Sequence, residues 1–539
     1  MKYSNIILSA GPINTNLMPV STNLSQGMIP VNGKPVIAWI IDDLISKKLT
    51  DISVVVNVED AYLIDFLNKT YSHRIDIEIL KIPNQGSIIT SLIHGLEQTK
   101  KTDGVRIILG DTLIQDSFEH AIDMVYITKV NETKRWCIAE LDSDNHISNY
   151  MDKGKEFYSS GLALAGYYHF TNKSHLLKSA LHAINNNATE LSSVLNKYSI
   201  DYPIKGIETT KWYDFGHVDN LAKARRNLLQ PRHFNTLKVN PILNTITKTS
   251  TDQQTLKNEL QWYLNLPEEL KVLVPRLVNF SDQSDVTTIV QEYYGYPTLA
   301  ELYVYAHIQP DSWLATLKYV LDIQNEFSKY PGAIDPLNIK FMYLDKTIDR
   351  IRTLGNQSDF WQELISSSEI TFNGNRLKNL PYIMKIIEGK VNRLIVKTDI
   401  QIIHGDFCFS NILYDLTHQI IRLIDPRGEF GEQTIYGDPR YDLAKLRHSV
   451  NGLYDFILAD MFKIDKHNKI FESEIYTHES TSQIQKEFDN LLVESKYNLD
   501  DLVFIQGLIF ISLTPLHKEN FERQLMLYLT GIQTLNQII

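Results

Sequence analysis

The sequence is poor in cysteine, since Cys137 and Cys408 are the two that it contains among 539 residues. Two cysteines exclude a disulfide-stapled scaffold and a cysteine-rich zinc site. Glycine and proline are also scarce, with 24 and 18 residues, which excludes a fibrous or low-complexity chain. Basic residues are outnumbered, 53 Lys plus Arg against 64 Asp plus Glu, and the formal charge of −11 disfavours nucleic acid as a partner.

Long apolar runs are lacking as well. The run that ends at Leu8 is too short for the core of a signal peptide. The most apolar later stretch, 503–516, is interrupted by polar residues and by Pro515, and it falls short of the roughly 20 residues that a membrane helix needs. We therefore expect no insertion into a membrane and a cytoplasmic location.

The first part of the chain alternates short β-rich runs with helical stretches. The predicted strands are 5–9, 52–58, 75–81 and 105–110, and the predicted helices are 36–46, 61–69 and 88–98. This alternation predicts an α/β fold with a parallel sheet covered by helices. Mostly strands are expected over 134–170, then one helix over 176–198.

A domain boundary is predicted near Pro231, which stops a helix over 218–229. The domains are then 1–230 and 231–539. The second divides into a small β-containing lobe, about 232–295, and a helical lobe, about 296–539. The elements expected in the small lobe are strands at 235–239, 245–248 and 287–292 and a helix at 253–265. The large lobe has almost entirely helical periodicity, apart from a hairpin-like pair of strands at 411–414 and 421–424.

A group of acidic and amide residues in the large lobe points to phosphoryl transfer. The motif His404-Gly405-Asp406 follows an apolar run, Asn411 comes shortly after it, and Asp425 follows the next strand. Transfer to a hydroxyl group needs one carboxylate to orient and deprotonate the acceptor. It also needs an amide oxygen and a second carboxylate to hold Mg²⁺ on a triphosphate. The residue types and their spacing agree with that chemistry.

These residues, together with the run Gly437-Asp438-Pro439-Arg440-Tyr441-Asp442-Leu443, resemble the aminoglycoside phosphotransferase and choline kinase family over roughly residues 232–539. The resemblance implies a bilobal, protein-kinase-like (α+β) domain that uses ATP and Mg²⁺. It implies that Asp406 is the catalytic base and that Asn411 and Asp425 are the Mg²⁺ ligands. It also implies that His404 supports the catalytic loop and that Asp442 braces it.

The small lobe offers candidates for binding ATP. A kinase needs a cation for the phosphates, held by a carboxylate on a helix, and Lys248 with Glu259 is the best pair; the alternative is a solvated lysine and a surface glutamate. Gln291 and Glu292, at the end of the next strand, are expected to form the hinge that contacts the nucleobase. No glycine-rich loop covers this region, and residues 240–244 stand in its place.

Several segments of the first domain resemble the sugar-phosphate nucleotidyltransferase family over about residues 1–230. They are Ile6-Ile7-Leu8-Ser9-Ala10-Gly11, Met28-Ile29-Pro30-Val31-Asn32-Gly33-Lys34-Pro35, Gln85-Gly86-Ser87, Leu109-Gly110-Asp111 and Trp212-Tyr213-Asp214-Phe215-Gly216. The resemblance implies a Rossmann-like domain in which a sugar phosphate attacks a nucleoside triphosphate such as CTP or UTP. By that resemblance Asp111 and Asp214 hold Mg²⁺, Lys153 contacts the sugar phosphate, and Gly11, Gln85 and Gly86 contact the nucleotide.

Two segments of the first domain depart from that family. Ile13-Asn14-Thr15 stands where Gly-Thr-Arg is usual, and Ser25-Gln26 stands where Pro-Lys is usual. Both expected cations are therefore absent, and losing one charge-stabilising donor typically costs about 10² to 10³ in rate. A working nucleotidyltransferase and a non-catalytic sensor or scaffold both stay open.

Kinases make phosphoesters and nucleotidyltransferases consume them, so the two domains predict a bifunctional enzyme. We expect it to activate a sugar, polyol or amino alcohol as a nucleoside-diphosphate derivative for capsule or lipopolysaccharide biosynthesis. Its partners would be that small-molecule alcohol and nucleotides. The alternative is an ATP-dependent kinase of small alcohols with a non-catalytic first domain. An antibiotic-modifying phosphotransferase is disfavoured, because such an enzyme needs no appended nucleotidyltransferase fold.

Overall fold

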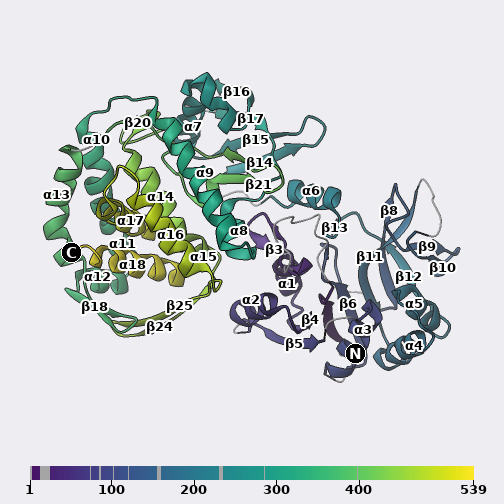
Figure 1. The fold of residues 1–539 in the computed structure, drawn as a ribbon. Coiled ribbons are helices and arrows are strands. Elements are labelled where there is room, and N and C mark those ends of the chain that lie inside the picture. The colour runs from purple at the N-terminus through teal and green to yellow at the C-terminus, as the bar shows by residue number, and fades with distance from the viewer. Residues whose placement is uncertain are drawn as a thin grey trace. The chain divides into compact units, whose positions relative to one another are not determined.

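The computed structural model describes residues 3–11, 25–72, 74–83, 86–100, 102–118, 121–154, 160–229, 235–283, 286–396 and 399–539. Internal contacts divide the chain into two compact units, Met1–Leu228 and Leu229–Ile539, which we call the amino-terminal and the carboxyl-terminal unit (Figure 1). The boundary predicted near Pro231 falls outside the described residues. Each unit is described by itself below.

The amino-terminal unit is built on one nine-stranded sheet, in which the path β10-β9-β11-β6-β1-β4-β5 is joined by β8 and β12. The strands are β1 (Tyr3–Leu8), β4 (Asp51–Asn57), β5 (Asp76–Ile82), β6 (Gly104–Leu109), β8 (Met124–Val130), β9 (Ile138–Leu141), β10 (Ile147–Met151), β11 (Gly161–Phe170) and β12 (Lys205–Glu208). As predicted, β1 runs parallel to both β4 and β6, and β4 runs parallel to β5. Strand β11 is antiparallel to β6 and ends the parallel part.

Helices cover this sheet because its strands are apolar on both faces. Ile6 and Leu8 of β1 belong to a core cluster with Leu92 and Leu96 of α3, while Ile7 between them is just as buried. Successive side chains of a strand point to opposite faces, so both faces need a cover. The helices are α1 (Val36–Ser46), α2 (Ala61–Tyr71), α3 (Ile88–Gln98), α4 (Lys173–Asn185), α5 (Leu191–Ser199) and α6 (Val218–Asn227).

The single helix predicted over 176–198 is wrong, because α4 and α5 are separate helices. Asn187 has a φ of +59° and lies just beyond the end of α4. Asparagine tolerates the left-handed conformation that ends many helices. The break is therefore a local one, which the apolar periodicity on either side conceals.

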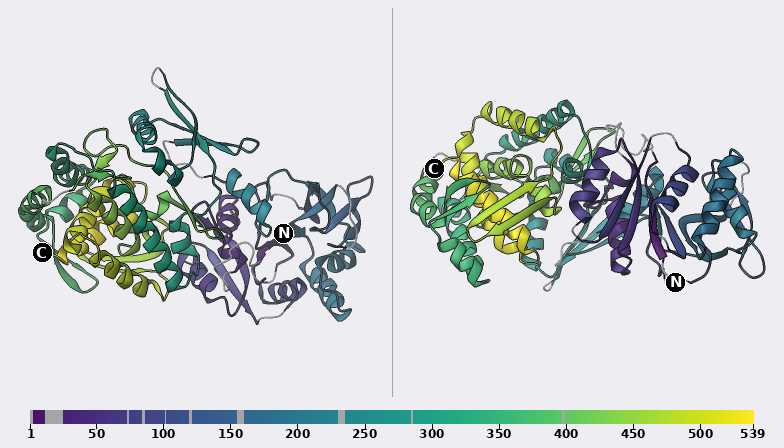
Figure 2. Two further views of the ribbon diagram at one scale, coloured as in Figure 1. Left: turned by 45° about the horizontal axis from the view of Figure 1, so that its top comes forward. Right: turned by 90° about the horizontal axis from the view of Figure 1, so that it is seen from below.

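The small lobe of the carboxyl-terminal unit is a four-stranded antiparallel sheet in the order β14-β15-β17-β16, with α7 packed on it. Its elements are β14 (Asn235–Asn240), β15 (Thr245–Ser250), α7 (Gln253–Asn265), β16 (Leu277–Gln283) and β17 (Val286–Glu292). Strand β16 was not predicted, because it is a polar edge strand with largely exposed side chains. In Figure 2 the teal strands of this lobe stand apart from the yellow helices of the large lobe.

The large lobe is mainly helical, as predicted. Its helices are α8 (Leu299–Tyr305), α9 (Pro310–Ser328), α10 (Pro336–Lys340), α11 (Lys346–Gly355), α12 (Asp359–Ser366), α13 (Leu380–Val396), α14 (Pro439–Val450), α15 (Tyr454–Leu458), α16 (Thr481–Val493), α17 (Leu499–Leu513) and α18 (Phe521–Asn536). The predicted pair of strands is present as β21 (Ile412–Asp415) and β22 (Ile420–Leu423), which pair antiparallel. Two further short strands, β20 (Gln401–Ile402) and β23 (Tyr436–Gly437), pair antiparallel. The motif His404-Gly405-Asp406 comes just after β20 in the sequence.

The prediction that this lobe holds a single pair of strands is wrong. A second four-stranded sheet has the order β19-β18-β25-β24. Its strands are β18 (Glu369–Phe372), β19 (Asn375–Lys378), β24 (Phe462–His467) and β25 (Ile470–Ile475). The turn between β18 and β19 is Asn373-Gly374, with both residues at positive φ. An Asn-Gly pair between short runs is a strong hairpin signal, so this element was detectable.

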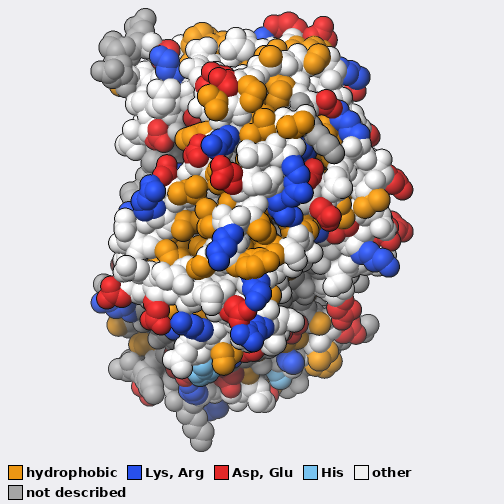
Figure 3. Space-filling view, turned by 90° about the vertical axis from the view of Figure 1, so that its left-hand side faces the viewer, with side chains coloured by type: hydrophobic (Ala, Val, Ile, Leu, Met, Phe, Trp, Pro, Cys, Tyr) orange, Lys and Arg blue, Asp and Glu red, His pale blue; other side chains and the backbone are white. Residues whose placement is uncertain are grey.

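One helix of the described residues, Leu499–His517, is long and apolar enough by composition to cross a membrane. About two thirds of its apolar stretch (67%) is buried inside the unit. The helix packs against α18 and α14, as a core helix does. On the face that Figure 3 draws, acidic and basic side chains are interspersed and apolar ones gather toward the middle. The described residues drawn there therefore form no continuous basic surface of the kind that nucleic-acid backbones attract.

Candidate active sites

The segment between β20 and β21 is held by a buried carboxylate. Asp442, in the first turn of α14, accepts hydrogen bonds from the backbone N–H of His404 at 2.7 Å and of Gly405 at 2.8 Å. Gln324 of α9 donates a third at 2.9 Å. Burial raises the pKa of Asp442 to about 7, although the two backbone N–H groups act against it. Gly405 has a φ of +77°, where other residues are strained.

Asp406, Asn411 and Lys445 form one hydrogen-bonded group beside that brace. The Asn411 side chain donates from Nδ2 to the backbone oxygen of Asp406 at 2.9 Å and to its Oδ2 at 3.1 Å. Lys445 of α14 lies with Nζ 2.8 Å from Asp406 Oδ1, and its own side chain is 6% exposed. The Asp406 carboxylate is therefore fixed by a partner on each oxygen while it remains partly exposed.

Lys248 joins the small lobe to the large one. Its Nζ lies 2.7 Å from Glu259 Oε2 of α7 and 2.8 Å from Asp425 Oδ1, which follows β22. Burial alone would lower the pKa of Lys248, but the carboxylates of Asp425 and Glu259 raise it above its usual value, so the ammonium stays charged. The predicted pairing of Lys248 with Glu259 is present in the structure, and the alternative of a solvated lysine is wrong.

Asn411 and Asp425 lie next to each other and fit Mg²⁺ chemically. The backbone N–H of Ile424 donates to the backbone oxygen of Asn411 at 3.0 Å, and Asp425 is the next residue. Both hydrogen bonds from the Asn411 side chain to Asp406 use the amide nitrogen as donor. The amide oxygen is the atom of this side chain that suits a metal ion. Mg²⁺ takes oxygen ligands and is commonly held by one or two protein groups plus substrate phosphates. Within the described residues no group of three or more His, Cys, Asp and Glu side chains gathers as a metal site.

The predicted hinge lies at the end of β17. The Glu292 side chain accepts from Arg276 at 3.0 Å and from the Tyr294 hydroxyl at 3.0 Å. Its backbone N–H donates to the Arg276 carbonyl, and that of Tyr293 donates to Asn244. These two N–H groups are thus engaged within the lobe. The nucleobase contact of Gln291, which is buried, and of Glu292 stays a prediction.

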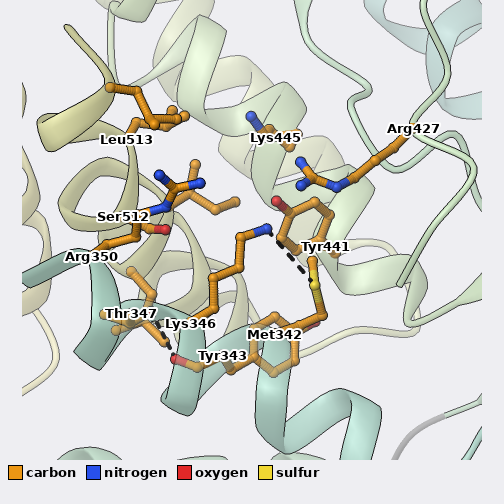
Figure 4. A pocket seen from close by; sticks show the side chains of 13 residues that line it. Met342, Tyr343, Lys346, Thr347, Arg350, Arg427, Tyr441, Lys445, Ser512 and Leu513 are labelled. Carbon is orange, nitrogen blue, oxygen red and sulfur yellow. Dashed lines mark hydrogen bonds between the residues drawn. The ribbon is translucent and has the colours of Figure 1, made fainter. Parts of the chain in front are cut away.

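A pocket lined by four cations lies beside the hydrogen-bonded group of Asp406, Asn411 and Lys445 (Figure 4). This pocket was not predicted from the sequence. Lys346 and Arg350 come from α11, Arg427 from the loop after β22, and Lys445 from α14. Lys445 stands one helical turn after Asp442, and this spacing could have placed both on one face of the helix. Lys346 and Arg350 carry no comparable signal, because the pattern of α11 is that of any amphipathic helix.

The amino-terminal unit brings its two predicted metal ligands together. Strand β13 (Trp212–Asp214) pairs with β7 (Thr112–Ile114), which places Asp214 opposite the residue that follows Asp111. The Asp214 carboxylate is 2.9 Å from His217 Nδ1 and accepts from Asn220 Nδ2 at 3.0 Å. Burial, and then the charge of Asp214, raise the pKa of Asp111 to about 6. Two adjacent carboxylates suit a divalent cation such as Mg²⁺.

The structure describes only some of the residues predicted to contact the nucleotide and the sugar phosphate. Lys153 is exposed and lies close enough to lower the pKa of Asp111. Gly11 is exposed shortly after β1. Gly86 precedes α3, where a Cβ atom would lie 2.8 Å from Thr90 Cβ, so only glycine fits. Gln85 lies outside the described residues. The segment Ile13-Asn14-Thr15, whose missing cation is one of the two departures, lies outside them too.

Known proteins match the amino-terminal unit. Residues 4–231 match the family model described as Nucleotidyl transferase. A curated relative, "Bifunctional protein GlmU" of Methanococcus maripaludis, is 26% identical over 229 residues, which are 42% of this chain and 54% of that protein. A second relative, the "Bifunctional sugar-1-phosphate nucleotidylyltransferase/acetyltransferase" of Sulfurisphaera tokodaii, is 25% identical over 227 residues, 41% of this chain and 54% of that protein. The chain thus spans about half the length of these relatives.

Solved structures align with the same part of the chain. HddC from Yersinia pseudotuberculosis, solved with GMP-PN, has 17% identity and a TM-score of 0.35, over 42% of this chain and 99% of that one. The cytidylyltransferase LicC from Streptococcus pneumoniae has 16% identity and a TM-score of 0.36, over 42% and 100%. The kinase-like fold of the carboxyl-terminal unit stays a prediction. For residues 4–231, by contrast, the match to the Nucleotidyl transferase family model supports the predicted nucleotidyltransferase-like domain.

Proposed function

We propose that the carboxyl-terminal unit is an ATP-dependent phosphotransferase that acts on a small alcohol. The observation that carries this proposal is the convergence of Lys248, Glu259 and Asp425 beside the Asp406–Asn411 group. A cation for the phosphates, a carboxylate that holds it, two oxygen ligands and a base are the parts that phosphoryl transfer requires. Four separate segments of the chain supply them.

In the proposed reaction Asp406 accepts the proton of the acceptor hydroxyl as that oxygen attacks the γ-phosphorus of ATP. The bond from the γ-phosphorus to the bridging oxygen of the β-phosphate breaks, and ADP leaves. Lys445 and Asn411 each hold one carboxylate oxygen of Asp406, so the base is oriented before the acceptor arrives. Lys248 stays protonated between two carboxylates and offers its charge to the ATP phosphates. Mg²⁺, held by Asn411 and Asp425, would neutralise charge on the triphosphate.

We further propose that the amino-terminal unit transfers a nucleotidyl group to the phosphorylated product. Its family supports this reading, as do the adjacent carboxylates of Asp111 and Asp214. The product would be a nucleoside-diphosphate derivative of a sugar, polyol or amino alcohol. Derivatives of this kind serve as donors for surface polysaccharides such as capsule or lipopolysaccharide.

A second candidate keeps the kinase and makes the amino-terminal unit a non-catalytic sensor or scaffold. Ser25-Gln26 favours it, because it stands where a Pro-Lys cation is usual and Gln26 brings no charge to the site. This candidate predicts nucleotide binding without release of pyrophosphate.

The phosphotransferase is tested by a screen for ATP consumption over sugars, polyols and amino alcohols, with the full chain and Mg²⁺. Asp406→Asn is expected to reduce turnover at least about 10²-fold, because a general base contributes about 10² to 10⁴. The matched control is Asp465→Asn, whose carboxylate is exposed on β24 and pairs with Lys463. Near-normal turnover in Asp406→Asn, with a folded protein, would falsify the assignment.

The nucleotidyl transfer is tested separately, by release of pyrophosphate from each nucleoside triphosphate in the presence of phosphorylated sugars and polyols. Asp111→Asn is expected to abolish it while ATP consumption by the other unit continues. If the wild-type chain releases no pyrophosphate with any pair of substrates, the second candidate is favoured.

A further inference from the structure

The pocket beside Asp406 has an unusual lining for a kinase of sugars or amino alcohols. It has a volume of about 50 Å³. A water molecule needs about 10 to 15 Å³ on this scale, so the space suits a group the size of a carboxylate or phosphate. Figure 4 shows Lys346, Arg350, Arg427 and Lys445 around it, with their charged ends turned toward one another.

Two of these four cations form no ion pair with a carboxylate of the described residues. Lys445 pairs with Asp406, and Arg427 pairs with Glu429 at 3.0 Å. Neither Arg350 nor Lys346 has such a carboxylate partner among the described residues. Lys346 Nζ instead donates a long hydrogen bond to Met342 Sδ at 3.9 Å. Burial and the facing cations lower the pKa of both groups, that of Lys346 to about 7.

This arrangement costs free energy, because partly buried like charges repel one another. The chain nevertheless holds them together from three segments. Lys346 and Arg350 share one face of α11 at a spacing of one turn. That helix begins directly after a π-helical turn, Phe341–Asp345, a feature frequent at functional sites. An anion in the pocket would offset the repulsion and give the guanidinium and ammonium groups hydrogen-bond acceptors.

The position of the pocket indicates which substrate carries the anionic group. Lys445 lines the pocket and also contacts Asp406, the proposed base. A small molecule that presents its hydroxyl to Asp406 therefore has its remaining atoms near these cations. Lys248, which would serve the ATP phosphates, is absent from the lining.

We propose that the acceptor of the phosphotransferase is a small alcohol that itself carries an anionic group, either a carboxylate or a phosphate, bound by Lys346, Arg350 and Arg427. This inference rests on the proposed phosphotransferase function and narrows its substrate class from alcohols in general to hydroxy acids and alcohol phosphates. Neutral polyols and cationic amino alcohols would be poor acceptors, because the pocket would keep its unpaired charges or repel them.

The test compares acceptors that differ in charge, with the full chain, ATP and Mg²⁺. Glycerate and glycerol 3-phosphate represent the carboxylate and phosphate arms, and glycerol and ethanolamine are the neutral and cationic comparisons. A hydrogen bond to a charged group is worth about 10- to 100-fold. We therefore expect kcat/KM for at least one anionic acceptor to exceed that for glycerol by 100-fold or more. Equal or better turnover of glycerol or ethanolamine would overturn the proposal.

Variants of the pocket residues test whether the preference for anionic acceptors arises from these cations. Arg350→Gln is expected to raise KM for the anionic acceptor about 10- to 100-fold and to leave KM for ATP unchanged. Arg352→Gln is the matched control, since Arg352 lies on the same helix, is exposed and pairs with Asp349. A change in KM for ATP instead would mean that the pocket serves the nucleotide, contrary to the proposal.

Direct binding separates this inference from the function on which it rests. Inorganic phosphate is titrated calorimetrically into the wild-type chain, Lys346→Met and Arg350→Gln. Binding that both variants weaken by about 10-fold or more supports the anion pocket even if no acceptor is phosphorylated. No binding to the wild-type chain, together with no turnover of anionic acceptors, overturns the pocket. Transfer to neutral alcohols alone would leave the phosphotransferase standing and the pocket refuted.

Discussion

Replacing Lys346 by Met should make the carboxyl-terminal unit more stable while it weakens anion binding. The Lys346 ammonium lies in a partly buried pocket and faces Arg350, Arg427 and Lys445, with the Glu429 carboxylate as the opposing charge. Methionine has a similar length, carries no charge and fills irregular apolar space. A gain in stability with a loss of binding is typical where a site stores unfavourable charge for function.

The size and pH dependence of the gain follow from the pKa of Lys346. It falls from 10.5 to about 7 in the native chain, which corresponds to at most about 5 kcal/mol. Because the side chain is partly exposed, solvent screens much of this, and we expect about 1 to 3 kcal/mol. Between pH 7 and 10 the unfolded chain binds more protons than the native one, so the stability of the wild-type protein rises with pH relative to the variant. The gain is therefore largest at and below pH 7 and shrinks toward pH 10.

The assay is urea unfolding of the wild-type chain, Lys346→Met and the control Arg352→Gln at pH 6, 7, 8 and 9. Two units are present, so the transition of the carboxyl-terminal unit is followed separately from that of the other. Added phosphate should stabilise the wild-type unit by an amount that grows with the logarithm of the phosphate concentration above the Kd, and the variant much less. A destabilised variant, or a gain that does not change with pH, would refute the reasoning about unpaired charge.

Three further changes test the rest of the site. Lys445→Met removes the cation 2.8 Å from Asp406, so the acidic limb of the pH profile of kcat/KM should move upward by about 1 to 3 pH units; an unmoved limb would mean that Asp406 is not the titrating base. Lys248→Met should lower kcat about 10²- to 10³-fold in the ATP-consumption assay and leave pyrophosphate release untouched. Gly428→Ala places a Cβ atom 2.0 Å from the Asn258 carbonyl oxygen of α7, and Gly428 has a φ of +65°, so we expect more than about 2 kcal/mol of destabilisation in urea.

The elements that the sequence predicted well are those with strong periodicity and few alternatives. Strands β1, β4 and β6 are short apolar runs between helices, and their parallel pairing follows from the crossover helices. The Lys248–Glu259 pair was predictable because a kinase-like motif such as His404-Gly405-Asp406 calls for a lysine on a small-lobe strand and a glutamate on the helix that follows. In each case one local pattern limits what the chain can form.

The elements that were missed depend on contacts between distant segments. Strand β16 is an exposed edge strand, so burial leaves no alternation in its sequence. The pocket cations come from α11, from the loop after β22 and from α14. Lys346 precedes Lys445 by 99 positions in the sequence, and nothing in either helix alone requires the other. The packing of both α11 and α14 against the common helix α17 brings them together.

The overall charge of the chain does not determine the charge of the substrate that a single pocket binds. A formal charge of −11 disfavours long-range attraction of polyanions. It does not exclude a small pocket where Lys346 and Arg350 outweigh the nearby acidic groups. Inside a pocket the effective dielectric constant is lower than in water, so a few converging cations outweigh many screened carboxylates on the surface. An acidic protein can therefore select an anionic acceptor, provided that the acceptor is small enough to enter the pocket, where the nearby cations outweigh the screened surface carboxylates.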